Sequence, residues 1–325
     1  MTTKHLTTKK LPLVFITALS LAVTGCSTLK TLTNKKEDVV ATATTDAKGY
    51  YEEAVNAIAK ERYNQAATAL NNIRTFYPTS SYSEQALLDL IYVHFNSGDY
   101  EAVTRTTAQF LQSYPSSRHA DYALYAQGVT HMQGSPKSSR LFRLDQSSRD
   151  TAYLRLAFAD FSNLVNRYPN SAYAADTALR MMDIYNQFAA HELNAAYWYV
   201  KRDAYLAAAN RAQWVFQYYP QSTSVPEAIA VLAYSNDKLG LTENANNYKT
   251  LLQINYPEYL GHDGKVRLPR AEVKAWQKTL STISFGKLGR VGQISTDGTS
   301  TYTGATRTQV ITKAQALQLP NSTAQ

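Results

Sequence analysis

The chain has 325 residues, of which 44% are apolar and 18% charged, and it contains 13 glycines, 10 prolines and one cysteine. The length provides for one to three domains with a substantial core, while the composition excludes a disordered or fibrous protein and a cysteine-rich fold. The net charge of +8 lies at the two ends, because residues 27–260 carry 21 basic and 22 acidic side chains, so no basic face for nucleic acid is predicted.

The first 25 residues have the three zones of a secretion signal. Three lysines precede an apolar stretch over 11–23 that is too short to span a bilayer comfortably, and Val23-Thr24-Gly25-Cys26 follows. This junction resembles a bacterial lipobox. The resemblance implies cleavage before Cys26, S-diacylglyceryl and N-palmitoyl groups on that residue, and sorting to the outer membrane through Ser27. The alternative is an ordinary signal peptide with an incidental cysteine.

Residues 26–48 are predicted to form the lipid anchor and a tether, after which a repeat begins. The dipeptide Tyr-Pro occurs five times between residues 77 and 257, and in the first four copies a serine stands two residues after the proline. A small or branched residue stands twelve positions before each proline, and a large apolar residue five before it. The first set is Ala66, Val103, Ala157, Ala208 and Ala245, and the second is Ile73, Phe110, Leu164, Val215 and Leu252.

The Tyr-Pro motif predicts the end of one helix and the start of the next. Proline cannot continue a helix and moves the preceding tyrosine away from helical angles, while the serine hydroxyl is expected to cap the following helix. The offsets are similar to those of the tetratricopeptide repeat. We therefore predict an all-α fold, an α–α superhelix of about five such repeats within 49–260. The units are 50–78, 81–115, 118–169, 172–220 and 223–257.

Two units are longer than the others. The third has a polar insertion over 134–150 before a helix expected at about 151–167, and the fourth has helices lengthened through 188–199. With the lipobox and the repeats, these segments resemble the BamD family, lipoproteins of the outer-membrane β-barrel assembly machine. The resemblance covers about 50–257 and rests on Arg149-Asp150, Ala157–Phe161, Arg167–Ser171, Glu192, Ala196, Tyr199, Arg202 and Asn210-Arg211.

The resemblance implies a non-enzymatic scaffold, lipid-anchored to the outer membrane of a diderm bacterium and facing the periplasm. Its implied partners are BamA, which is the barrel-forming subunit, the other lipoproteins of the machine, and unfolded barrel proteins. The candidate partner-binding residues are Arg149, Asp150, Arg202, Asn210 and Arg211. A peptide groove in the first two units has Tyr63, Tyr82 and Tyr92 as candidates, and packing in the core is the alternative for these rings.

No pattern in the sequence points to catalysis or to a cofactor. The six histidines are scattered without metal-binding spacing, and no GxSxG, GxGxxG or P-loop motif occurs. We therefore predict no catalytic residue, no metal site and no cofactor. Two rival functions stand beside the scaffold: a repeat lipoprotein that recruits peptidoglycan-remodelling enzymes, and an envelope hydrolase, which the absence of a nucleophile motif disfavours.

Residues 261–325 show no match to the repeat. Residues 268–283 can form an amphipathic helix that caps the last unit. Beyond it glycine, serine and threonine dominate, so we expect a disordered basic tail. Its charge would suit acidic headgroups or peptidoglycan, and a merely solvated tail is the alternative.

Overall fold

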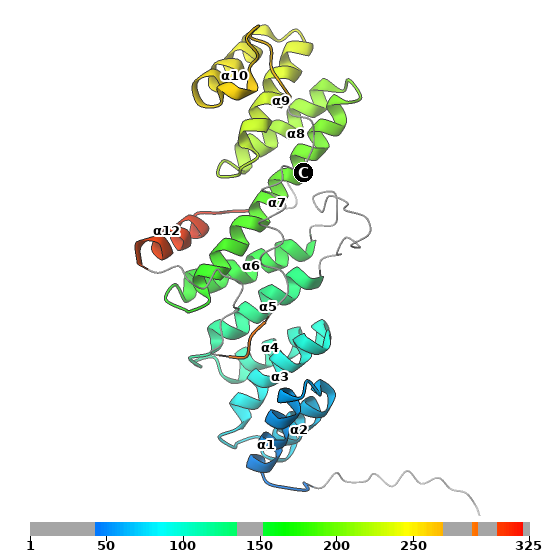
Figure 1. Cartoon of the computed structure of the whole chain (residues 1–325), viewed down its shortest axis with the longest axis vertical. Coiled ribbons are helices and arrows are strands. Elements are labelled where there is room, and N and C mark those ends of the chain that lie inside the picture. The colour runs from blue at the N-terminus through cyan, green and yellow to red at the C-terminus, as the bar shows by residue number, and fades with distance from the viewer. Residues whose placement is uncertain (1–42, 135–151, 269–287, 292–303, 321–325) are drawn as a thin grey trace, which may run out of the picture. The chain divides into compact units, whose positions relative to one another are not determined.

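The computed structural model describes residues 43–134, 152–268, 288–291 and 304–320. Five helix pairs follow one another in these residues, and each helix packs on the next in chain order (Figure 1). The predicted all-α repeat fold is confirmed. The first helices of the pairs are α1 (Ala47–Ala59), α3 (Ser83–Ser97), α5 (Ala120–Gly134), α7 (Ala174–Val200) and α9 (Val225–Lys238). The second helices are α2 (Tyr63–Phe76), α4 (Tyr100–Ser113), α6 (Ala152–Arg167), α8 (Tyr205–Tyr218) and α10 (Thr242–Asn255).

The repeat positions identified in the sequence form the seam between the paired helices. All ten residues at the two offsets before the prolines are fully buried, with 0% of their surface exposed. The alanines of the next first helices, Ala86, Ala123, Ala178 and Ala228, are equally buried. Small residues at these positions allow the helices to approach closely, and the large apolar residues fill the space between them.

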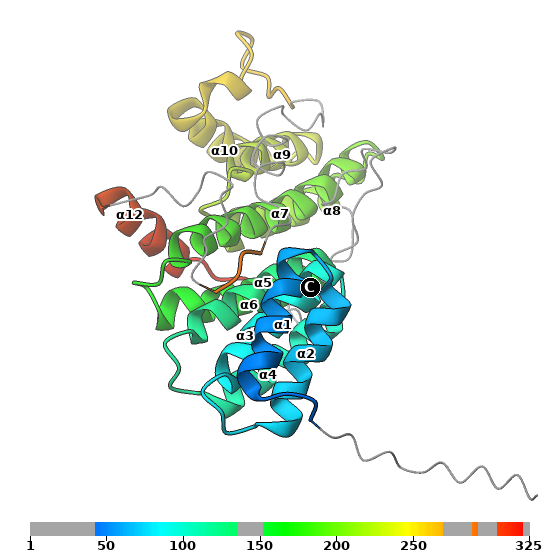
Figure 2. The same cartoon turned by 60° about the horizontal axis from the view of Figure 1, so that its bottom comes forward.

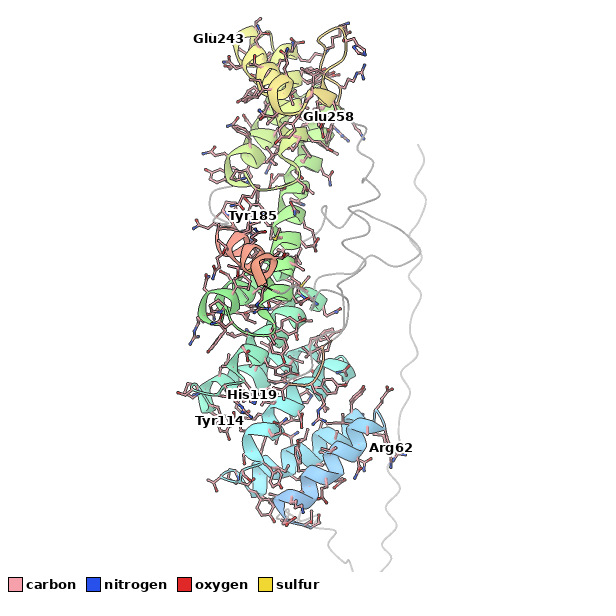
Figure 3. All side chains as sticks on the ribbon, turned by 60° about the vertical axis from the view of Figure 1, so that its left-hand side comes forward. Arg62, Tyr114, His119, Tyr185, Glu243 and Glu258 are labelled. Carbon is pink, nitrogen blue, oxygen red and sulfur yellow. The ribbon has the colours of Figure 1, made fainter. Side chains whose placement is uncertain are left out.

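Each second helix ends at its Tyr-Pro motif, as predicted. Tyr77 has φ −135° and ψ 53°, and Tyr114, Tyr219 and Tyr256 have similar angles outside the helical region. The amide of each of these tyrosines still donates to the carbonyl four residues earlier, for example Tyr77 N to Ile73 O at 2.8 Å. Figure 3 shows Tyr114 and His119 on either side of the turn between α4 and α5.

The predicted capping role of the serines is wrong in detail. The hydroxyl of Ser117 accepts the amide of His119 at 3.0 Å, within the turn rather than in the first turn of α5. The same hydroxyl donates to Glu84 of α3 at 2.6 Å. Ser171 does the same with Asp121 of α5 at 2.6 Å. In these two turns the serine therefore ties the turn to the first helix of the unit that has just ended, because its position in the turn places it beside that helix.

In the fourth unit the predicted lengthening falls on α7 alone, and the predicted insertion of the third unit lies outside the described residues except for Gly134. Helix α6 begins at Ala152, directly after the insertion, and α7 extends over 27 residues. Tyr185 lies on α7 (Figure 3) and packs edge-on against Tyr219, with ring centroids 5.2 Å apart. The lengthened α7 contacts α6, α8 and α9, so it joins the third unit to the fourth and fifth.

The prediction of a disordered tail is wrong for residues 304–320. Helix α12 (Gly304–Gln315) packs on α6 and α7 (Figures 1 and 2). Ile311, Ala314 and Leu317 are buried in the main core at a spacing of three residues. Gln315 Nε2 also donates to Val165 O at 2.9 Å. Most of the expected capping helix over 268–283 lies outside the described residues.

Candidate functional site

The three groove tyrosines lie at the border between core and surface. Tyr63, Tyr82 and Tyr92 are each half-buried against the apolar core of the first unit. The ring of Tyr82 packs on Tyr51 of α1, with centroids 5.1 Å apart. Burial and the neighbouring Tyr92 hydroxyl raise the pKa of Tyr63. The side chains therefore contribute to packing and also present part of their surface to solvent.

A buried carboxylate, which the sequence reasoning missed, lies beside these tyrosines. The side chain of Asp89 on α3 is only 1% exposed. Its oxygens accept hydrogen bonds from the Tyr51 hydroxyl and from Gln85 Nε2, each at 3.2 Å. They also accept two from the guanidinium of Arg290, at 3.0 and 2.6 Å. The first-helix face of the second unit thus carries a strong acceptor for a cation.

A second buried charge network joins the third and fourth units. Arg180 Nε donates to Asp176 Oδ2 at 2.6 Å, and the Tyr125 hydroxyl donates to the same oxygen at 2.7 Å. All three side chains are almost completely buried. Burial is the main cause that raises the pKa of Tyr125, so its hydroxyl keeps its proton at neutral pH. These groups position α7 against α5.

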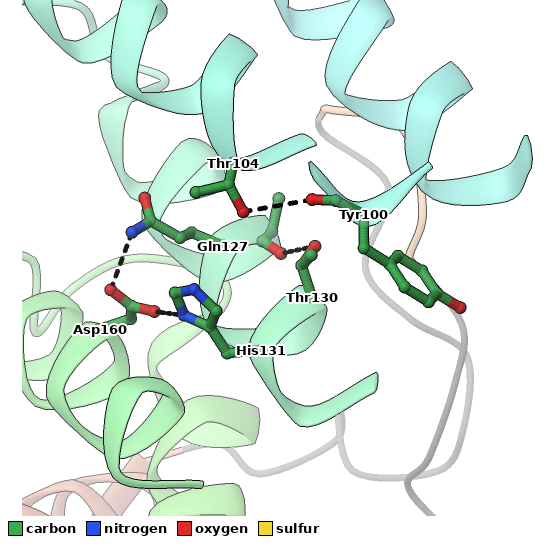
Figure 4. Close-up of polar contacts among 7 residues, drawn as sticks. Tyr100, Thr104, Gln127, Thr130, His131 and Asp160 are labelled. Atoms are coloured by element: carbon green, nitrogen blue, oxygen red, sulfur yellow. Dashed lines mark hydrogen bonds and ion pairs between the residues drawn. The ribbon is translucent and has the colours of Figure 1, made fainter. Parts of the chain in front are cut away.

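A polar contact between α5 and α6 fixes the third unit below its insertion. His131 Nδ1 lies 2.5 Å from Asp160 Oδ2, and Gln127 Nε2 donates to the other carboxylate oxygen at 3.1 Å (Figure 4). The side chains of both His131 and Asp160 are about 15% exposed or less. A carboxylate held by two side chains of one helix fixes the middle of α6 against α5, so this contact is structural.

The fourth unit exposes several of the predicted partner residues. Asn210 is exposed on α8, together with Leu206, which is 63% exposed one turn earlier. At the end of α7 the guanidinium of Arg202 lies 3.6 Å from the ring centroid of Trp198, which is half exposed. Arg211 is half-buried. An exposed tryptophan and leucine beside arginines have the chemistry of a protein-binding surface.

Arg211 differs from its neighbours because it is tied to α7. Its Nη1 donates to Glu192 Oε2 at 2.9 Å, and the Glu192 side chain is 3% exposed while that of Arg211 is 41% exposed. The guanidinium therefore has a structural partner and also reaches the surface. The remaining predicted residues, Cys26, Arg149 and Asp150, lie outside the described residues.

Comparisons with known proteins cover the repeats. The family model YfiO, described as an outer membrane lipoprotein, matches residues 43–251. The outer membrane protein assembly factor BamD of Pasteurella multocida is 35% identical over 242 residues, covering 74% of this chain and 89% of that protein. BamD of Haemophilus influenzae is 30% identical over 268 residues, covering 82% of this chain and 99% of that protein. The chain belongs to the BamD family.

The BamD family match contains both candidate surfaces but not the whole described structure. It begins just before α1 and ends within α10, so Asp89, the groove tyrosines and Arg211 all lie inside it. Arg290 and helix α12 lie beyond its last residue. The cation that meets Asp89 therefore comes from a segment that the family model does not include.

The described residues contain neither a metal-binding cluster nor a membrane-spanning helix. No group of three or more His, Cys, Asp or Glu side chains is placed to hold a metal ion in the described parts of this BamD-family chain. None of its described helices combines the length and the apolar character needed to cross a membrane.

Proposed function

We propose that this BamD-family chain is a lipid-anchored scaffold that takes part in assembling outer-membrane β-barrel proteins from the periplasmic side. The observation that carries the proposal is the family match, which extends across the five helix pairs and is shared with relatives named as outer membrane protein assembly factors. A repeat scaffold of this kind works by holding extended peptides and partner domains on its helical surfaces.

The two candidate surfaces are suited to different binding partners. Half-buried tyrosines beside a buried carboxylate, in the first two units, suit an extended peptide that ends in an aromatic residue. Such a peptide is the last strand of an unfolded barrel protein. The exposed Trp198, Leu206 and Asn210 of the fourth unit suit a folded partner domain, for which we propose BamA.

The anchor is the lipid on Cys26. Several buried acyl chains at about 0.8 kcal/mol per methylene hold a protein on a membrane almost irreversibly. Cys26→Ser is expected to give a folded protein that appears in the soluble periplasmic fraction. If the variant stays with the membranes in high salt, the lipid is not the anchor.

The test of the partner surface compares two exposed asparagines on second helices. Asn210→Ala on α8 should weaken co-purification with BamA, whereas Asn64→Ala on α2 is the matched control and should not. Arg211→Lys keeps a positive charge near Glu192 but removes the planar fork, so it should also weaken co-purification. Unchanged recovery of BamA with both Asn210→Ala and Arg211→Lys would exclude this surface.

The test of the substrate groove uses photo-crosslinking side chains at Tyr82 and Tyr92 and at Trp198. A peptide from the last strand of a barrel protein should crosslink in the first two units and not in the fourth. Crosslinks confined to the fourth unit would refute the groove. Pull-down of the lipidated protein from solubilised membranes distinguishes the rival function, because recovery of peptidoglycan hydrolases without barrel-assembly proteins would favour it.

A further inference from the structure

Residues 288–291 of the chain lie on the surface that is proposed above to bind a substrate peptide. This short segment is orange and runs beside α5 in Figures 1 and 2, and Arg290 reaches Asp89 of α3, 201 residues earlier in the chain. Leu288 is 4% exposed and belongs to the main core, and Val291 packs against it. The chain's own C-terminal part therefore binds where the first two units are proposed to bind a peptide.

The repeat pattern does not account for a carboxylate at position 89. Asp89 stands three residues after Ala86, in the middle of α3. It stands eleven residues after the proline of the Tyr-Pro motif, and at this offset the third, fourth and fifth units have Ala126, Arg180 and Val231. All three are buried, and none of them is an acid. A buried acid costs stability unless a cation meets it.

The cation at Asp89 comes from outside the repeats. The two other buried acids of the described first helices are paired within the repeats, Asp176 with Arg180 one turn away on its own helix and Glu192 with Arg211 of α8. Within the described part of the repeats, the donors to Asp89 are the neutral Tyr51 and Gln85, both at 3.2 Å. Arg290 supplies the two shorter bonds, one to each carboxylate oxygen, in the planar geometry that distinguishes arginine from lysine.

We propose that Asp89, with Tyr51 and Gln85, forms a receptor for an arginine side chain of an extended peptide, and that residues 288–291 are its resident occupant, which an incoming peptide must displace. The folded repeats provide the receptor, and a segment tethered far along the chain provides the ligand. Because tethering gives the segment a high effective concentration, the resident occupant lowers the apparent affinity for any peptide added from solution. Only the step in which a barrel-protein peptide enters this same site rests on the proposed function.

The experiment measures binding of a fluorescent peptide with the sequence of residues 284–295 to the full mature chain in detergent. The wild-type chain should bind it weakly, because Arg290 already fills the site. The Arg290→Gln chain should bind it at least tenfold more tightly. The same peptide carrying glutamine at position 290 should lose at least tenfold in affinity for the Arg290→Gln chain. Arg307→Gln is the matched control, since Arg307 anchors α12 to Pro169 and Ser171 carbonyls elsewhere, and it should behave as the wild type.

Two results would overturn the proposal. One is an Arg290→Gln chain that binds the peptide no more tightly than the wild type, and the other is equal binding of the arginine and glutamine peptides. The double variant Asp89→Asn/Arg290→Gln should abolish tight binding. If that variant does not fold, as judged by circular dichroism, the two peptide comparisons still decide, because they leave the receptor intact.

A second probe, the last strand of a barrel protein, separates this proposal from the function proposed above. Tighter binding to Arg290→Gln than to the wild type supports competition at the shared site. Equal binding to both chains overturns the competition. Binding to neither chain, while the 284–295 peptide binds Arg290→Gln, refutes the substrate groove and supports the arginine receptor.

Discussion

Replacing Arg180 tests whether the buried network between the third and fourth units supports the fold. Asp176 and Arg180 are one turn apart on α7, and their side chains are 4% and 1% exposed. Arg180→Met preserves much of the side-chain volume but leaves the Asp176 carboxylate without this guanidinium, although the Tyr125 hydroxyl still donates to it. Removing one partner of a buried ion pair typically costs about 3–5 kcal/mol, a large part of a total stability of about 5–15 kcal/mol.

The matched control is Arg105→Met, because Glu101 and Arg105 have the same spacing on α4 but are 85% and 63% exposed. An exposed pair of this kind contributes less than about 1 kcal/mol. Urea unfolding followed by circular dichroism gives the free energy of unfolding of each variant. The double variant Asp176→Leu/Arg180→Met should recover part of the loss, since it removes both buried charges. Equal midpoints for Arg180→Met and Arg105→Met would refute the reasoning.

Three further predictions follow from single positions. Gly128→Ala should cost about 1–3 kcal/mol in urea unfolding, because its Cβ would lie 2.3 Å from a ring carbon of the fully buried Phe161; no loss would show that the ring can move. Burial lowers the pKa of His94 below its ordinary value of 6.5, so the unfolded chain takes up a proton that the folded chain does not, and stability should fall as the pH drops below about 6.5. His94→Gln should flatten this part of the pH profile, and an identical slope in the variant would exclude His94 as its cause. Ile311→Ser should release α12 to early protease cleavage with little change in the melting of the repeats, and unchanged cleavage would show that Ile311 does not hold the helix.

The repeat fold could be predicted from the sequence because its determinants are local. Ala157 and Leu164 stand at fixed offsets from one proline, and helical periodicity alone places them on one face. The Tyr-Pro motif ends each helix through the covalent restrictions of proline, whatever packs against it. The serines were placed correctly as turn residues, but their partners, such as Glu84 for Ser117, lie on another helix and depend on how the helices pack.

The pairing of Asp89 with Arg290 and the packing of helix α12 were decided by the tertiary structure. Asp89 is one acid among many in the sequence, and Arg290 is one base in a segment rich in glycine, serine and threonine. Helix α12 has only a few apolar residues, and these stabilise it because α6 and α7 cover them. A contact between residues 201 positions apart leaves no periodic pattern in the sequence, since it depends on chain closure and on the burial of both partners, and only the assembled core provides that burial.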